Sequence, residues 1–172
     1  TTETGPGSLQ QALLDVCDGG RILLQVSGGS FSFNAALATP KNVTLDGTDQ
    51  TFTLTDAPLL TLGKNLVLIG DEITLNAVNT VSPQTNTGGN VTLIVKKGNL
   101  LVKEIITASN ATTGNAGTGG KVTLTVPLGK IQVLGDILTY SHSDLADAGD
   151  AGDVILIAGE GIETGSINAS AF

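Results

Sequence analysis

The fold of this chain is decided by a seven-residue stretch that occurs three times in the second half of the sequence. The three copies are Gly89-Asn90-Val91-Thr92-Leu93-Ile94-Val95, Gly120-Lys121-Val122-Thr123-Leu124-Thr125-Val126 and Gly152-Asp153-Val154-Ile155-Leu156-Ile157-Ala158. Every second residue from the third onward is a small aliphatic one, and this alternation predicts a β-strand in each copy. The valines that open the strands, Val91, Val122 and Val154, lie 31 and 32 positions apart. A repeat of this length predicts coils that stack on one another as a β-solenoid.

Each copy continues in the same way. A Gly turn comes next, then an aliphatic residue, then a second aliphatic residue five or six positions further on: Gly98, Leu100 and Ile105; Gly129, Ile131 and Ile137; Gly161, Ile162 and Ile167. This pattern predicts three short strands per coil, joined by Gly or polar corners. The first half repeats over a shorter period, since Asn42-Val43-Thr44-Leu45 and Asn65-Leu66-Val67-Leu68 lie 23 positions apart.

The side chains expected to face the interior recur from coil to coil. They are Val91, Leu93 and Val95; Val122, Leu124 and Val126; and Val154, Leu156 and Ala158. Stacking joins them into one continuous core, because no single coil can bury its own apolar face. A narrow coil interior suits small aliphatic side chains, which agrees with a composition of 40% hydrophobic but only 3% aromatic residues. The net charge of −8 disfavours binding of nucleic acid through a basic face.

One stretch, residues 8–17, is typical of a helix. It places apolar residues on one stripe at helical spacing, namely Leu9, Ala12, Leu13, Val16 and Cys17. Ser8 is the expected N-cap, with Gln11 completing a capping box, and the helix ends at Asp18-Gly19-Gly20. We expect this helix to cover the N-terminal end of the core, and Cys17 to be a small buried residue on its apolar stripe.

The chain is therefore expected to form a single β-helix domain over residues 1–172. Its parts are a capping helix at 8–17, first coils over 21–80 and three repeats of about 31 residues over 88–170. Six or seven coils, stacked about 4.8 Å apart, make a rod about 30 Å long. No apolar run is long enough for a transmembrane helix, so membrane insertion is not expected.

Two parts of the sequence resemble known proteins. The run Gly7-Ser8-Leu9-Gln10-Gln11-Ala12-Leu13-Leu14-Asp15, followed by Asp18-Gly19-Gly20-Arg21-Ile22, resembles the capping helix and first strand of secreted right-handed parallel β-helix proteins. These include bacterial surface adhesins of the polymorphic outer-membrane and autotransporter passenger type. Lys41-Asn42-Val43-Thr44-Leu45-Asp46-Gly47 is similar to their second-coil motif. The three later copies, with Gly165-Ser166-Ile167-Asn168-Ala169-Ser170, resemble filamentous-haemagglutinin-type repeats, a form common in cyanobacterial surface proteins.

This resemblance implies an all-β fold, a right-handed parallel β-helix with a short N-terminal capping α-helix. It also implies an elongated protein that is extracellular or attached to the cell surface. It transfers no catalytic residue, because β-helices carry adhesins, lyases, hydrolases and passive fibres alike.

The sequence offers little for catalysis. Arg21 is the only Arg and lies at the expected cap, and the Lys residues are scattered. His142 is the only His, and it lies in a polar loop without a nucleophile motif, so a solvated loop residue is expected. We therefore predict no enzyme activity, no catalytic residue and no cofactor. The alternative is a β-helix that binds or cleaves polysaccharide along a groove.

A loop with an Asp at every third position is the one candidate for metal binding. Its residues are Asp144, Asp147, Asp150 and Asp153. Flexible loops rich in oxygen can hold Ca²⁺, but this spacing matches neither the EF-hand loop nor the Gly-rich nonapeptide repeat. The alternative is a solvated loop whose like charges discourage mispairing. A Thr-x-Thr pattern at Thr123 and Thr125 suggests ice binding as a further possibility, because ice-binding solenoids carry regular rows of Thr on a flat face. Here the row of Thr is not regular, because Ile155 and Ile157 occupy the equivalent sites in the next coil.

Several aliphatic residues are candidates for an interface. Ile94, Ile155 and Ile157 are expected to point outward and to form a flat strip for lateral packing against a neighbour. Ile167 and Phe172 lie in the last coil, where the sequence shows no cap. The expected partners are further copies in a fibre, further coils of a longer solenoid, or a surface polysaccharide. The sequence thus favours a non-enzymatic structural or adhesive module of an extracellular fibre.

Overall fold

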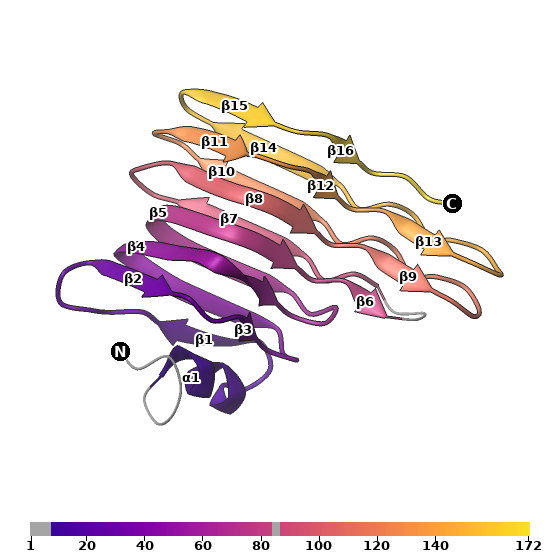
Figure 1. Cartoon of the computed structure of the whole chain (residues 1–172), viewed down its shortest axis with the longest axis horizontal. Helices are drawn as coiled ribbons and strands as arrows, with labels where there is room; N and C mark the ends of the chain where they lie inside the picture. The colour runs from indigo at the N-terminus through magenta and orange to yellow at the C-terminus, as the bar shows by residue number, and fades with distance from the viewer. Residues whose placement is uncertain (1–7, 84–86) are drawn as a thin grey trace.

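The computed structural model describes residues 8–83 and 87–172 (Figure 1). The protein is mostly β, with 52% of the described residues in strands, and its parallel sheet curls until it is nearly closed on itself. The all-β prediction is thereby confirmed. The sheet has solenoid-like curvature, and successive segments of the chain stack along one direction from α1 to β15 (Figure 1).

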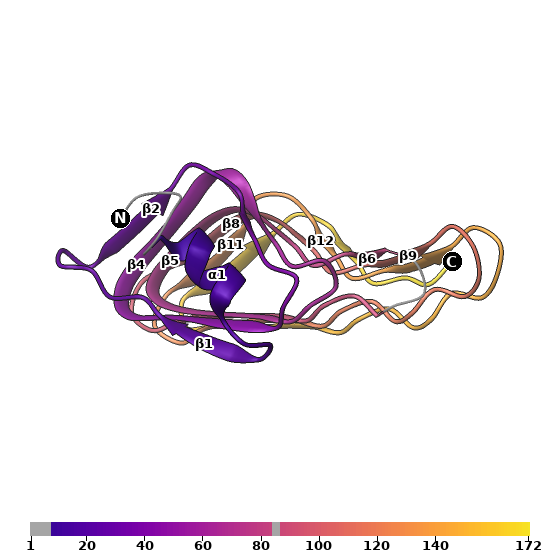
Figure 2. The ribbon, with the colours of Figure 1, turned by 90° about the horizontal axis from the view of Figure 1, so that it is seen from below.

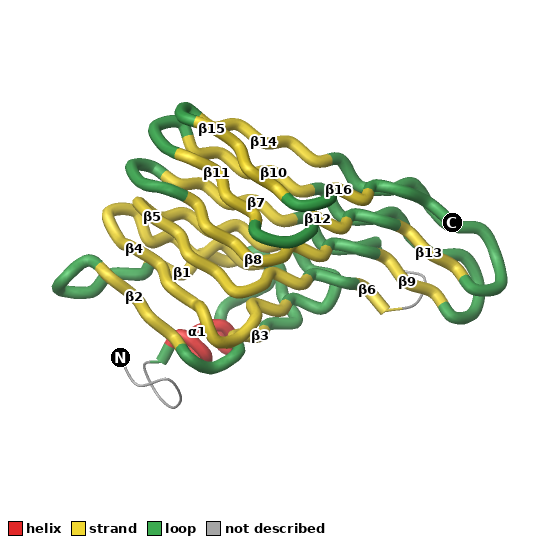
Figure 3. The backbone as a smooth tube through the Cα atoms, turned by 45° about the horizontal axis from the view of Figure 1, so that its top comes forward, coloured by secondary structure: helices red, strands yellow, loops and turns green. Residues whose placement is uncertain are grey.

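The described residues contain one helix and sixteen strands. In chain order they are α1 (Leu9–Asp15), β1 (Gly20–Leu23), β2 (Ser30–Phe33), β3 (Leu37–Ala38), β4 (Val43–Leu60), β5 (Leu66–Asn79), β6 (Ser82–Pro83), β7 (Val91–Val95), β8 (Leu100–Ile106), β9 (Ser109–Ala111), β10 (Val122–Val126), β11 (Lys130–Val133), β12 (Ile137–Leu138), β13 (Ser141–Ser143), β14 (Val154–Ala158), β15 (Gly161–Thr164) and β16 (Ile167–Asn168). Within the described ranges, thirteen strands form one sheet, while β6, β9 and β13 form another. Turns and loops lie at both ends of the stacked strands (Figure 3).

Strands of successive coils pair in parallel and in register. Val122 of β10 pairs with Val91 of β7 on one side and with Val154 of β14 on the other. Leu66 of β5 pairs with Val91, and Val43 of β4 pairs with Leu66. The spacings of 31 and 32 residues in the second half, and of 23 residues in the first, are therefore confirmed as the offsets between neighbouring coils.

Strand β4 is longer than the sequence predicts. The sequence pattern predicts short strands separated by corners, whereas β4 runs from Val43 to Leu60 as one strand. The pairing of β4 with β5 shifts register at two corners, the first of them between Gly47 and Thr51. Asp49 at this corner has a φ of 64°, a left-handed conformation that Asp tolerates better than most residues. The backbone thus bends at the corner and remains part of the same ladder.

The core lies inside the curled sheet. Aliphatic residues of β7 and β10 that are predicted to face inward are fully buried: Val91, Leu93, Val95, Val122, Leu124 and Val126. Their equivalents in β14, Val154, Leu156 and Ala158, are half-buried and pack against this core. Three aromatic residues fill the N-terminal coils instead, and the rings of Phe33 and Phe52 lie 5.8 Å apart.

Helix α1 covers the N-terminal end of the core, as predicted (Figure 2). Leu9 and Leu13 are buried, and the Ser8 side chain accepts a hydrogen bond from the Gln11 backbone N–H at 3.1 Å. The Gln11 side chain does not close the expected capping box; it donates to Asp15 Oδ1 at 2.9 Å. Lys41 Nζ donates to the carbonyl oxygens of Leu14 and Val16, which satisfies acceptors at the end of the helix.

The prediction for Cys17 is wrong. The helix ends at Asp15, two residues before the predicted boundary, and Val16 already has the extended angles φ −58° and ψ 142°. Cys17 therefore leaves the apolar stripe and is exposed.

A thin extension projects from one side of the curled sheet (Figure 2). We call it the fin; it comprises β6, β9, β13 and the segments 112–119 and 144–151. Its two chain layers approach so closely that a Cβ atom built on Gly119 would lie 1.9 Å from the Thr139 carbonyl oxygen. Only glycine fits at such a contact.

Candidate functional site

A row of buried threonines joins the fin to the core. Thr80, Thr107 and Thr139 donate their hydroxyls to the carbonyl oxygens of Gly89, Gly120 and Gly152, at 2.5, 2.6 and 2.7 Å. The same three glycines donate their N–H groups back to the threonine carbonyl oxygens, at 2.9, 2.5 and 2.8 Å. Each of these coils is therefore closed by a reciprocal Thr–Gly pair.

This row has a sequence signal that the strand pattern did not reveal. A buried aliphatic residue precedes each threonine by two positions: Leu37 and Thr39, Leu59 and Thr61, Val78 and Thr80, Ile105 and Thr107, Ile137 and Thr139. The threonine hydroxyls have partners, so their burial is compatible with a stable core. The row therefore has a structural role, since it holds the two chain layers together at the base of the fin.

The last coil, which comprises β14, β15 and β16, is called the terminal coil. Within the described residues its strands pair only with the coil beneath. Ile162 and Ile167 pair with the buried residues Ile131 and Ile137, yet they are 46% and 47% exposed. They occupy core positions that no described residue covers. Ile167, predicted as an interface residue, thus lies on an open apolar end.

The C-terminal part of the chain is also acidic. From residue 131 onward the sequence has no Lys or Arg, and it has seven acidic residues: Asp136, Asp144, Asp147, Asp150, Asp153, Glu160 and Glu163. Two of them contact donors of the coil beneath, because Asp153 Oδ2 lies 3.9 Å from Lys121 Nζ and Glu163 Oε2 accepts from Gln132 Nε2 at 2.9 Å.

A flat stripe of β-branched residues crosses four coils on the outside of the sheet. Its two rows are Val67, Thr92, Thr123 and Ile155, and Ile69, Ile94, Thr125 and Ile157. No charged residue interrupts the stripe. Ile155 and Ile157 are 37% and 53% exposed, whereas Ile94 is half-buried. The three residues predicted to form an outward strip therefore do lie on one face.

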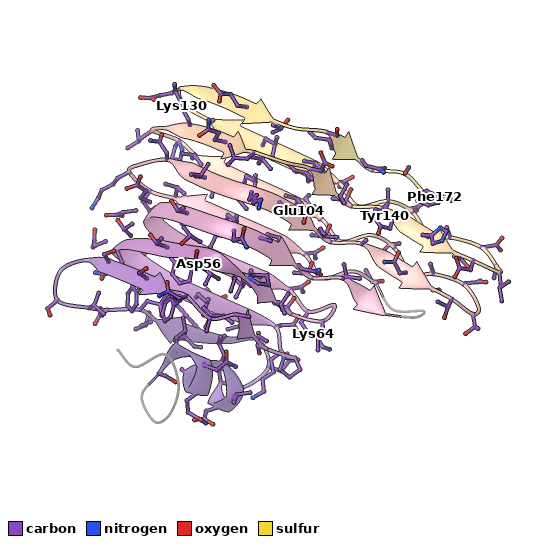
Figure 4. All side chains as sticks on the ribbon, in the orientation of Figure 1. Asp56, Lys64, Glu104, Lys130, Tyr140 and Phe172 are labelled. Atoms are coloured by element: carbon purple, nitrogen blue, oxygen red, sulfur yellow. The ribbon has the colours of Figure 1, made fainter. Side chains whose placement is uncertain are left out.

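A polar hollow lies where β5, β8 and the turn after β11 bend together. Its lining includes Asn76, Lys103, Glu104 and Asp136. A second hollow beside it shares Asn76 and Lys103 and adds the exposed Leu134. Glu104 lies near the middle of the stack (Figure 4). Amide, ammonium and carboxylate groups of this kind can bind hydroxyl groups, and sequence reasoning did not select these residues.

Three rings meet on the fin. The Phe172 ring lies 5.8 Å from that of Tyr140 and 4.8 Å from that of His142 (Figure 4). His142 lies in β13, where it pairs with Asn110, and its Nε2 is 2.8 Å from Asp144 Oδ1. His142 is thus half-exposed with fixed partners, rather than a free loop residue. Phe172, a predicted interface residue, is 59% exposed at this cluster.

The aspartates of the predicted calcium loop do not converge. All four side chains, those of Asp144, Asp147, Asp150 and Asp153, are exposed. Among the described residues no group of three or more His, Cys, Asp or Glu side chains could hold a metal ion. The loop instead stacks by its backbone on segment 112–122; Asp147, Asp150 and Asp153 each offer a carbonyl oxygen to an N–H group there. Calcium binding remains a prediction.

Lys97, Asp49 and Asp71 form an ion-pair cluster that links three neighbouring coils. Lys97 Nζ lies 2.8 Å from Asp49 Oδ1 and 2.8 Å from Asp71 Oδ2. The hydrogen bonds with Asp49 and then Asp71 raise the pKa of Lys97 above its ordinary value. Both carboxylates share one ammonium group, so we interpret the cluster as an ion-pair network that stabilises the fold.

Helix α1, the one helix in the described ranges, is too short and insufficiently apolar to span a membrane. Comparison of the chain with protein-family models, with curated proteins and with solved structures gave no match. The resemblance to β-helix adhesins therefore depends on the sequence motifs alone.

Proposed function

We propose that this chain is a right-handed parallel β-helix module that serves as a rigid, non-enzymatic building block of an extracellular or cell-surface fibre or adhesin. The observation that carries the proposal is the in-register stack of parallel strands. Val43, Leu66, Val91, Val122 and Val154 pair one after another in a single column through five successive coils. Stacked repeats of this kind share one continuous core and make an elongated, rigid structure.

The interior supports a mechanical role. Val, Leu and Ile side chains stack in register along the sheet, and Thr–Gly pairs close three of the coils at the base of the fin. Backbone ladders between coils resist bending and stretching along the stack, because every coil must break its hydrogen bonds at once. The resemblance to surface adhesins agrees with such a role and supports a secreted location.

The stripe supports lateral packing within a fibre. Its eight residues are uncharged and β-branched, so a neighbouring flat surface could pack on them without desolvating a charge. Ile155→Lys with Ile157→Lys is expected to reduce lateral association while leaving single rods intact. Unchanged bundles by electron microscopy would count against this part of the proposal.

Electron microscopy of the purified protein tests the main proposal. Rods or filaments with a repeat on the scale of one chain are expected, together with no release of reducing sugar from pectin or alginate. Monodisperse particles that depolymerise either polysaccharide would overturn the proposal.

The second candidate is a polysaccharide-binding or polysaccharide-cleaving β-helix. The polar hollow at Asn76, Lys103, Glu104 and Asp136 is the observation that favours it. Retention of the protein on an immobilised acidic polysaccharide, lost on Lys103→Ala, would support this candidate.

Calorimetric titration with Ca²⁺ tests the aspartate loop, and heat that vanishes on Asp147→Asn with Asp150→Asn would support a site there.

A further inference from the structure

The outside of the sheet has a corner in the middle of the stack, where the alternation of buried and outward residues breaks in two neighbouring coils. Asn76 and Ala77 of β5 are both half-buried, and in β8 the exposed Lys103 is followed by the half-buried Glu104. Ala77 pairs with Glu104 in the ladder. Two adjacent columns of side chains therefore face outward here, one through Asn76 and Lys103 and the other through Ala77 and Glu104.

The next coil extends both columns. Asp136 lies level with Glu104, because the residues that follow them, Ile137 and Ile105, pair with each other. Leu134, two residues before Asp136, is 62% exposed. The two hollows described above lie along these columns, and together we call them the corner groove. The larger hollow has a volume of about 290 Å³ and is open to solvent.

The polar side chains of the corner groove are available to a ligand. No described residue forms a hydrogen bond or an ion pair with the side chain of Asn76, Lys103 or Glu104. Lys97 and Lys121 elsewhere on the surface do pair with aspartates. The corner groove is thus a place where charges of both signs lie close together and are not used by the fold.

The two columns suit different groups of a ligand. Lys103 is the one cation among the described residues that line the groove, and an ammonium group binds a carboxylate through charge-assisted hydrogen bonds. Glu104 and Asp136 only accept hydrogen bonds when ionised, so they suit hydroxyl donors. Leu134 adds an apolar surface for the C–H face of a ring. A sugar that carries a carboxylate and neighbouring hydroxyls meets all of these requirements at once.

We propose that the corner groove binds a uronic-acid oligosaccharide, with a sugar carboxylate at Lys103 and hydroxyl groups at Glu104 and Asp136. The groove runs from Thr55 to Leu134 across four successive coils, a length of about 14 Å that accommodates a short run of sugar units. This inference names the class of ligand for the adhesive role in the proposed function, on which it rests. The net charge of −8 repels polyanions at a distance, so a single groove is expected to bind weakly and to depend on Lys103.

Titration calorimetry of the whole chain with trigalacturonate and with trimannuronate tests the inference, in buffer without divalent cations. At least one of the two is expected to bind about tenfold tighter than the same trisaccharide with its carboxyl groups reduced to alcohols. Added salt is expected to reduce this preference. Binding of neither acidic trisaccharide, or equal binding of the acidic and reduced forms, would overturn the inference.

Three variants locate the site. Lys103→Met is expected to remove the preference for the acidic form, while Glu104→Ala is expected to weaken both forms by about 2- to 10-fold, since both keep the hydroxyl groups. Lys130→Met is the matched control, because it removes the same charge from an exposed lysine that lies apart from Glu104 (Figure 4). Equal losses from Lys103→Met and Lys130→Met would assign the effect to overall charge and overturn the inference.

Failure of this inference can be distinguished from failure of the proposed function. Rods or filaments in the electron microscope, without binding of either acidic trisaccharide, would leave the proposed function standing and remove the inference. Binding that depends on Lys103 but ends in a shortened trisaccharide would support the groove and overturn the non-enzymatic function.

Discussion

Thr107 and Gly120 bond to each other twice. The Thr107 hydroxyl donates to the Gly120 carbonyl oxygen at 2.6 Å, and the Gly120 N–H donates to the Thr107 carbonyl oxygen at 2.5 Å. Thirteen residues separate them in sequence. Their pairing closes one coil at the base of the fin, and the coils before and after it repeat the arrangement with Thr80 and Thr139.

Substitution of Gly120 by Ala is expected to destabilise the protein. A Cβ atom at this position would lie 2.2 Å from the Gly89 carbonyl oxygen of the coil beneath, so the backbone of one coil must move. Overpacking of this kind costs about 1–3 kcal/mol. The cost should appear as a lower urea midpoint with an unchanged slope of the unfolding free energy on urea concentration.

Gly161→Ala is the matched control. Nothing lies within 4 Å of a Cβ atom at Gly161, and its φ is not in the left-handed region. Its free energy of unfolding should stay the same or rise by about 0.4–1 kcal/mol, because Ala restricts the unfolded chain. Equal losses from both substitutions would contradict the close approach at Gly120.

A ladder of asparagine side chains gives a second prediction. Asn42 Oδ1 accepts from the Asn65 N–H, Asn65 Oδ1 from the Asn90 N–H, and Asn90 Oδ1 from the Lys121 N–H, each at 2.8 Å. Asn65→Ala removes the acceptor for Asn90, at a cost of about 0.5–1.5 kcal/mol in the free energy of unfolding. Asn65→Asp keeps an acceptor oxygen at this position and should lose less. The prediction fails if chemical denaturation gives Asn65→Asp a lower free energy of unfolding than Asn65→Ala.

The helix gives a third prediction. Leu13 is fully buried, so Leu13→Ala is expected to cost about 2–5 kcal/mol and to expose the apolar end that α1 covers. Leu14 is 50% exposed on the same helix, so Leu14→Ala should change stability by no more than about 0.5 kcal/mol. Thermal unfolding and light scattering measure both effects. Similar melting temperatures for the two variants would show that α1 does not seal the core.

The repeat in the sequence was sufficient to predict which coils pair and which side chains face inward. Two independent patterns identify the same buried residues: the alternation of apolar residues along each strand, and the recurrence of apolar residues at the same place in successive coils. Val91, Val122 and Val154 satisfy both signals, and they lie in one column. The N-cap Ser8 was equally predictable because its partner is three residues away.

Features that depend on close approach of distant segments were not predictable in this way. The Thr107–Gly120 pair requires two chain layers to come within hydrogen-bonding distance, and strand periodicity carries no information about that gap. The Phe172 ring likewise meets His142 across 30 residues and between two coils. Cys17 was misplaced because the helical pattern of apolar residues continues to residue 17, whereas the helix ends at Asp15 and Val16 is already extended.

The Lys97 cluster gives a prediction about pH. Its pKa is raised by the hydrogen bonds with Asp49 and then Asp71, so the folded state holds the Lys97 proton more tightly than the unfolded state does. The stabilisation is complete below the unfolded pKa of about 10.4 and is lost as the pH rises through the higher folded value. The difference in free energy of unfolding between the original protein and Lys97→Met should therefore be constant near neutral pH and should narrow at strongly alkaline pH. Urea titrations of the two proteins over this range measure it, with Lys64→Met, an exposed lysine elsewhere on the chain, as control. A difference that stays constant or widens as the pH rises would show that Lys97 does not hold these three coils together through its charge.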